Sequence, residues 1–152
     1  MLHTADVHSQ LFPRPLRIGA SDAGRGLGAY GSEVEVGGAA RLAAVVREER
    51  AKHARVFAFD CGDAVQGAAV FNAFRGEAEL SVLSQLEIDA QVLGNHEFDL
   101  APEELARTYA SARFPVVSAN LATLREANGA LHFVEPWTVV QARVNIGTTL
   151  RG

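Results

Sequence analysis

Three short stretches of the sequence bring acidic, imidazole and amide side chains close together along the chain. They are Asp6-Val7-His8, Asp60-Cys61-Gly62-Asp63 and Gly94-Asn95-His96-Glu97-Phe98-Asp99. Mixed carboxylate, imidazole and amide ligands suit Mn, Zn or Fe better than a purely oxygen-rich site for Ca. The residue types therefore indicate a metal site if the fold brings the three stretches together.

Each spacing has a physical interpretation as part of a metal site. Asp6 and His8 lie two positions apart, so on an extended backbone their side chains point to the same side and could bind one cation. Gly62 permits a tight turn before Asp63, whose carboxylate could bridge two cations. Asn95 offers a neutral oxygen ligand, which binds a cation without adding charge.

His96 and Asp99 lie three positions apart in the third stretch. If that turn is helical, the two side chains can meet and Asp99 could orient His96. A histidine beside a metal suits a general acid that serves a leaving oxygen. Taken singly, these motifs have common structural explanations, because Asp and Asn often form turns and a lone histidine is usually structural. Their occurrence after three consecutive candidate strands favours the functional interpretation.

The segments between these stretches predict alternating strands and helices. We expect a strand before Asp6, further strands at 56–59, 90–93 and 114–117, helices at 39–54, 77–86 and 102–112, and extended segments over 131–146. Such alternation predicts an α/β fold with a parallel-rich sheet and flanking helices. Ligands bind at the carboxyl ends of the strands in such sheets, which is where the polar stretches fall. Residues 9–38, rich in glycine and proline, predict a long loop.

Length and composition exclude several classes of protein. A chain of 152 residues suits one domain, and 48% hydrophobic with 21% charged residues is typical of globular proteins. The sequence contains no run of eighteen apolar residues, so we expect no membrane-spanning helix in it. A net charge of −4 without a basic cluster argues against binding of nucleic-acid polymers. The single cysteine, Cys61, excludes an internal disulfide and a cysteine zinc site, and we expect its thiol to be buried.

Two further features have weak functional interpretations. Residues 26–31 match the G-x-G-x-x-G pattern of dinucleotide-binding loops, but no strand precedes them and the next helix starts only after Gly38. Arg25 and Arg75 could contact a phosphate, although an exposed position is the default for arginine.

The three stretches, together with Ser118-Ala119-Asn120-Leu121, resemble the calcineurin-like metallophosphoesterases. The resemblance is closest to the bacterial 5′-nucleotidase and UDP-sugar hydrolase branch, and it covers most of residues 1 to 137. It implies the N-terminal portion of a four-layer αββα domain. It also implies a cofactor of two divalent metal ions, with Mn, Zn, Fe, Co and Mg as the open choices.

The resemblance implies roles for individual residues. Asp6 and His8 would ligate the first metal, Asp63 would bridge both metals, and Asn95 would ligate the second. His96 would stabilise developing charge or protonate the leaving group.

Asp99 would support His96 in that role. The implied reaction is attack of a metal-bound hydroxide on the phosphorus of a 5′-nucleotide or related phosphate ester.

The sequence also departs from the pattern of the family it resembles. The family completes its metal site with later histidines, including a Gly-His-x-His element, and the 152 residues contain no such element. We therefore expect residues 1–152 to be a partial catalytic domain without the C-terminal nucleoside-binding domain. Alone, this piece should bind metal weakly and show little activity.

Other functions and the location of the protein stay open at this point. The alternatives are a non-catalytic truncated remnant or association module, a cyclic-nucleotide phosphodiesterase, and a sulfur-ester hydrolase. The first residues of the chain show no basic region followed by an apolar one, so no signal peptide is expected in this chain. Members of the branch are usually exported, so we expect the intact parent in the periplasm or outside the cell. Its partners would be the phosphate-ester substrate and the missing C-terminal part of the same enzyme.

Overall fold

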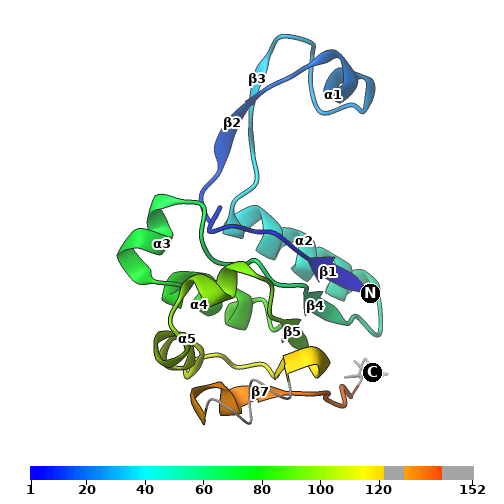
Figure 1. The fold of residues 1–152 in the computed structure, drawn as a ribbon. Helices are drawn as coiled ribbons and strands as arrows, with labels where there is room; N and C mark the ends of the chain where they lie inside the picture. The colour runs from blue at the N-terminus through cyan, green and yellow to red at the C-terminus, as the bar shows by residue number, and fades with distance from the viewer. Residues whose placement is uncertain (122–128, 142–152) are drawn as a thin grey trace, which may run out of the picture.

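A five-stranded parallel sheet forms the centre of the computed structural model, which describes residues 1–121 and 129–141 (Figure 1). Its strand order is β1-β4-β5-β6-β7, and every neighbouring pair is parallel. The strands are β1 (Leu2–Thr4), β4 (Ala58–Asp60), β5 (Ala90–Val92), β6 (Val116–Val117) and β7 (Val134–Glu135). Thr4 lies opposite Asp60, and Asp60 lies opposite Gln91, so the first three strands end nearly level. The predicted parallel-rich α/β fold is confirmed.

The helices that follow these strands agree with the predicted ones, with one addition. In the described parts of the chain, the α-helices of six residues or more are α2 (Ala39–Lys52), α3 (Ala69–Phe74), α4 (Glu77–Gln85) and α5 (Pro102–Tyr109). The described residues also contain three 3₁₀ turns: η1 (His96–Asp99), η2 (Ala119–Leu121) and η3 (Gly129–Phe133). Helix α3 was not predicted, because a six-residue apolar run does not distinguish helix from strand.

One face of the sheet is packed against helices and the other is more open. Asp60, Gln91 and Val116 share the packed face with Val134, and all of them are almost fully buried. The core continues into α4 and α5, whose Leu80 and Leu105 are inaccessible to solvent. On the opposite face Phe59 and Val117 are half-buried and Val92 is 43% exposed. The four-layer αββα arrangement stays a prediction, since the described residues place helices and one main sheet.

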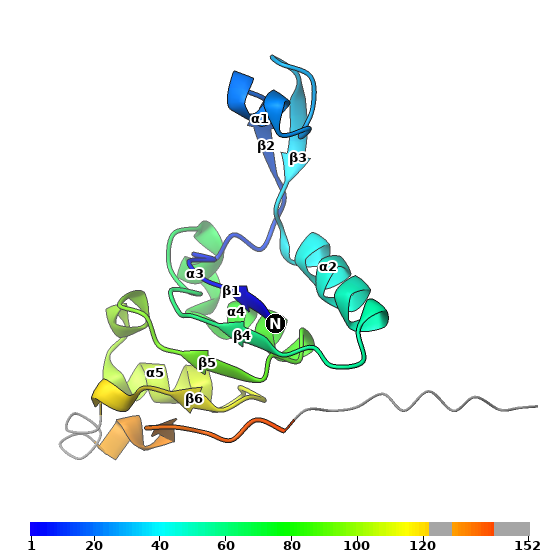
Figure 2. The same ribbon diagram turned by 90° about the vertical axis from the view of Figure 1, so that its right-hand side faces the viewer.

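The prediction of a long loop over residues 9–38 is wrong. Strands β2 (Arg14–Arg17) and β3 (Glu33–Val36) pair antiparallel, and α1 (Ala20–Gly24) lies between them. This hairpin projects away from the main sheet, as the two views in Figures 1 and 2 show. The two strands were not predicted because they are only four residues long and because Pro15 and the glycines in this part of the sequence are more typical of loops.

The chain after β6 is less extended than predicted. Gly129–Phe133 forms the 3₁₀ turn η3, so the extended conformation expected from residue 131 begins only at Val134. Residues 142–146 of that predicted segment lie outside the described residues.

Within the described parts of the chain, no helix combines the length and apolar character needed to cross a membrane.

Candidate metal centre

The segments that leave β1 and β4 run side by side and are joined by backbone hydrogen bonds. The amide of Asp6 donates to the carbonyl of Gly62 (3.0 Å), and the amide of His8 donates to the carbonyl of Asp63 (3.0 Å). These bonds hold the first two polar stretches against each other at the carboxyl edge of the sheet.

The backbone of the first stretch is not extended, contrary to the prediction. Asp6, His8 and Ser9 have φ of 54°, 47° and 56°, in the left-handed region that non-glycine residues adopt rarely. Asp6 Oδ1 nevertheless lies 3.8 Å from His8 Nε2. The two side chains meet through a sequence of left-handed turns rather than through the alternation of a strand, and such turns are concentrated at functional sites.

Two glycines allow the loops after β4 and β5 to approach closely. Gly62 has φ +88°, and a Cβ there would overlap the backbone of Gly94. A Cβ on Gly94 would overlap the carboxylate of Asp63. The tight turn predicted at Gly62 is confirmed, and Asp63 follows it with φ 51°.

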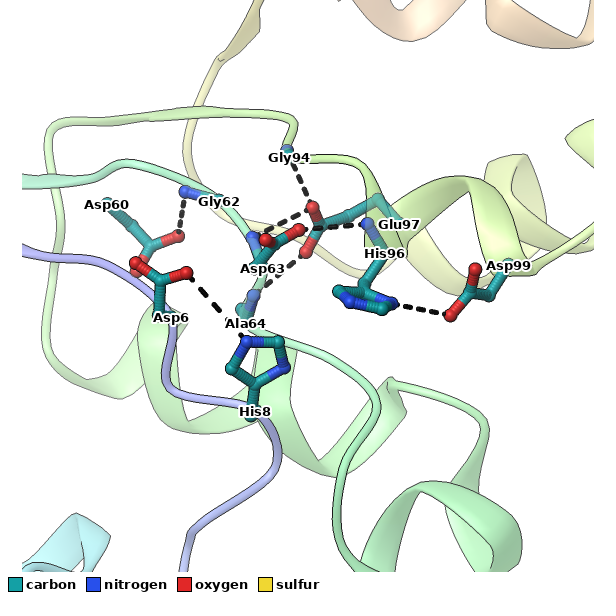
Figure 3. A network of polar contacts seen from close by, with 10 residues as sticks. All are labelled: Asp6, His8, Asp60, Gly62, Asp63, Ala64, Gly94, His96, Glu97 and Asp99. Atoms are coloured by element: carbon teal, nitrogen blue, oxygen red, sulfur yellow. Dashed lines mark hydrogen bonds and ion pairs between the residues drawn. The ribbon is translucent and has the colours of Figure 1, made fainter.

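His8, Asp63 and His96 form a compact group at the edge of the sheet. Each offers one ligand atom, and these atoms all lie within 4.8 Å of one another (Figure 3). The two imidazole rings meet edge to face, with centroids 5.1 Å apart and an interplanar angle of 73°. Two imidazoles and a carboxylate are a donor set for Zn, Mn or Fe, so the side chains present fit a divalent metal ion.

His96 and Asp99 are in contact, as their spacing predicted. The 3₁₀ turn η1 brings His96 Nδ1 to 2.8 Å from Asp99 Oδ2. This hydrogen bond raises the pKa of His96, and the contact leaves Nε2 as the ring atom free to serve a ligand. Asp99 is therefore placed to orient the ring, as carboxylates do for histidines beside metals.

The remaining predicted ligands lie at the margin of this group. The side chain of Asp6 is 70% exposed and reaches the group through His8. Asn95 is exposed and directly precedes His96 at the start of η1. The structure thus brings His8 and Asp63 together with His96 and places Asp6 against His8, whereas Asn95 adjoins the group only through its position beside His96 in the chain.

Glu97 was not singled out in the sequence, although it is completely buried within the site. Its carboxylate accepts hydrogen bonds from the amides of Asp63 (3.0 Å), Ala64 (2.9 Å) and Gly94 (2.6 Å). Burial raises the pKa of this carboxyl group. The sequence did contain a signal for this position. His96 and Asp99 share one face of the turn η1, so the side chain of Glu97, which lies between them in the sequence, has to point in another direction.

Asp60 is a second buried carboxylate with a structural position. It accepts hydrogen bonds from the Thr4 hydroxyl (2.5 Å), the Gln91 side-chain amide (2.7 Å) and the Gly62 amide (3.1 Å). Burial raises the pKa of Asp60. Its bonds join the ends of β1, β4 and β5, so Asp60 fixes the strands from which the three loops start.

The structure also tests the positions expected for Cys61 and Arg75. Cys61 is exposed, not buried as predicted. Its amide continues the pairing of β4 with β1 by donating to the carbonyl of Thr4, so its side chain points to the face opposite that of buried Asp60, which is the more open face of the sheet. Arg75 is an ordinary surface arginine, whose guanidinium forms a salt bridge with Glu104 (2.9 Å).

A cavity of about 570 Å³ lies beside the metal-binding loops, between α2 and α4. Val7 and Ala64, which adjoin the candidate ligands in sequence, line it together with Leu42 and Leu83. None of the grouped side chains His8, Asp63 and His96 lines the cavity, so the candidate chemistry does not lie within it.

The chain is similar to known proteins over most of its length. A family model described as calcineurin-like phosphoesterase matches residues 1–140. A snake venom 5′-nucleotidase of Crotalus adamanteus is 38% identical over 122 residues, which are 80% of this chain and 19% of that protein. The solved 5′-nucleotidase precursor of Thermus thermophilus is 37% identical with a TM-score of 0.78, covering 92% of this chain and 25% of that one. The NAD nucleotidase of Haemophilus influenzae gives 31% identity and a TM-score of 0.67 over 77% of this chain and 20% of that one. The chain spans about a fifth of the length of the curated relatives it matches.

Proposed function

Because the chain belongs to the calcineurin-like phosphoesterase family, we propose that it supplies part of the metal centre of an enzyme that removes phosphate from 5′-nucleotides or related phosphate esters. The observation that carries this proposal is the convergence of His8, Asp63 and His96 within 4.8 Å. The relatives named as 5′-nucleotidases support the nucleotide as substrate.

We assign the metal-binding roles to four residues. Asp6 and His8 would hold one divalent ion, Asp63 would bridge two ions, and Asn95 would bind the second. Bound divalent ions would lower the pKa of a coordinated water and neutralise charge on the phosphate. Asp63 occupies the centre of the group, between the loops that carry the other ligands, which suits a bridging carboxylate.

His96 would act on the substrate from the rim of the metal site. Asp99 accepts from or shares the proton at Nδ1, so a proton carried at Nε2 is directed toward the cluster. From there His96 would donate it to the leaving oxygen or stabilise the charge that develops on the phosphate.

The whole enzyme would extend beyond the part of the site carried here. The relatives are about four to five times longer than the matched region, which supports a partial catalytic domain over residues 1–152 with further metal ligands and a nucleoside-binding part outside it. One relative is a venom enzyme and another is named a precursor, and both support action outside the cytoplasm.

The proposed function is tested by substituting Asp63, the proposed bridging ligand, and His96, the proposed acid, and measuring the release of phosphate. In the intact protein, Asp63→Asn and His96→Asn should each reduce hydrolysis of AMP and of p-nitrophenyl phosphate by a factor on the order of 10² or more, the usual worth of a positioned acid or base. Glu103→Gln, which removes an exposed carboxylate on α5, is the matched control and should keep the parental rate. Parental activity in both site variants would overturn the assignment. Preference for a cyclic nucleotide or a sulfur ester over AMP would instead identify a related hydrolase.

A further inference from the structure

We propose that Glu97 is a positioning residue that holds the metal-binding loops in register. The inference rests on the proposed function, since it concerns the same site. Glu97 itself would touch neither metal nor substrate, because its side chain is fully buried and both of its oxygens are already hydrogen-bonded.

The segment Gly62–Ala64, which we call the bridging segment, has hydrogen-bond partners on both of its sides. On one side its three carbonyls accept from the amides of Asp6, His8 and Ser9, at 2.9 to 3.0 Å. On the other side its three amides donate to buried carboxylates, one to Asp60 and two to Glu97. The segment therefore transmits the position of Glu97 to the loop that carries Asp6 and His8.

The carboxylate of Glu97 also connects the bridging segment to the loop after β5. Glu97 Oε2 accepts from the amides of Asp63 and Gly94, while Oε1 accepts from Ala64. One carboxylate thus fixes two loops through three donors. Three loops then share one framework, because the loop after β1 is bonded to the bridging segment.

The donor pattern explains why a carboxylate is needed at this position. A carboxylate accepts through both oxygens, whereas a glutamine of nearly the same shape accepts through only one. In Glu97→Gln, at least one of the amides of Asp63, Ala64 and Gly94 would face an NH₂ group and lose its partner. A buried amide without a hydrogen-bond partner is unfavourable, so the loop that carries it would shift to find another one.

The experiment compares Glu97→Gln with Leu105→Ala in the full chain. Leu105 is a completely buried core residue of α5, so its truncation destabilises the fold without removing a bond to the loops. One readout is Mn²⁺ affinity, and the other is hydrogen exchange of the His8 and Ser9 amides without metal, measured relative to the Gln91 amide within the sheet. Loss of a group that hydrogen-bonds to a metal-binding residue typically weakens metal binding about 10- to 100-fold.

We expect Glu97→Gln to weaken Mn²⁺ binding by that factor and to speed exchange at His8 and Ser9 selectively. Folded Leu105→Ala should bind Mn²⁺ within about threefold of the parent and show no selective change. If Glu97→Gln does not fold by circular dichroism, Glu97→Asp gives the same comparison, because the shorter side chain cannot reach all three amides. Unchanged affinity together with unchanged exchange would overturn the inference and leave the proposed function intact. If the parent binds no Mn²⁺, the proposed metal site fails. The exchange readout alone then decides whether Glu97 positions the loops.

Discussion

The backbone amide of His96 donates a hydrogen bond of 2.8 Å to Asp63 Oδ1. The bond fixes the carboxylate at the centre of the candidate site from the loop after β5. The Asp63 amide in turn donates to Glu97, the next residue of that loop. Asp63 is therefore held at both its backbone and its side chain before any ligand is present, and this pre-organisation favours binding of a cation.

Gly94→Ala should disrupt the centre by a steric effect. The added Cβ would overlap the Asp63 carboxylate, so Asp63 must leave its present position beside His8 and His96. We expect Mn²⁺ affinity to fall by at least tenfold and stability to fall by about 1–3 kcal/mol, as for other overpacked sites. Metal titration and urea unfolding measure the two effects.

Gly24→Ala is the matched control for this substitution. Nothing lies within 4 Å of a Cβ at that position, so metal affinity should not change. Equal effects of the two substitutions would show that the close approach at Gly94 does not matter for the site.

The core beneath the sheet should respond strongly to the loss of volume. Leu105 is 0% exposed and packs within the main hydrophobic core, so Leu105→Ala should lower the free energy of unfolding by about 2–5 kcal/mol. Val45→Ala on α2 should cost much less, since Val45 is 52% exposed. Chemical denaturation gives both values, and similar losses would contradict the placement of the core.

The salt bridge between Arg75 and Glu104 predicts a pH dependence of stability. The Arg75 guanidinium holds the pKa of Glu104 below its ordinary value. A carboxyl group with a depressed pKa stabilises the fold above the pKa of the unfolded chain, and this contribution is lost as the pH falls through the folded-state pKa.

Glu104→Gln should therefore destabilise the protein slightly at pH 7 and not at all once the parent carboxylate is protonated. The effect at pH 7 should shrink in high salt, because both partners are partly exposed. Measurements of the free energy of unfolding at pH 7 and in acid, where Glu104 is protonated, check the sign of this effect. A loss that persists in acid would assign it to packing instead of charge.

The alternation of strands and helices was predictable because apolar periodicity and glycine positions record it directly. Leu80 and Leu83 lie on one buried face of α4, and Pro102 begins α5. Convergence of the polar stretches followed from topology, since parallel strands end at one edge of a sheet. The contact of His96 with Asp99 followed from helical spacing.

Other features depend on tertiary structure and were not predictable from local patterns. The left-handed turns at Asp6 and His8 are stabilised by hydrogen bonds to a segment more than fifty residues away in the sequence. The inward position of Glu97 is likewise set by the amides of distant loops. Residue propensities do not contain information about such long-range bonds. The hairpin of β2 and β3 was missed for a local reason, since proline and glycine in residues 9–38 are more typical of loops than of strands.

Broadening of the histidine resonances by Mn²⁺ tests the central claim most directly, because the chain carries its own internal controls. His8 and His96 lie within the candidate centre, whereas His53 and His132 are exposed at the end of α2 and in η3. We predict that the imidazole signals of His8 and His96 broaden at Mn²⁺ concentrations that leave those of His53 and His132 sharp. Equal broadening of all four, or sharp His8 and His96 signals at saturating Mn²⁺, would contradict a metal centre at the carboxyl edge of this sheet.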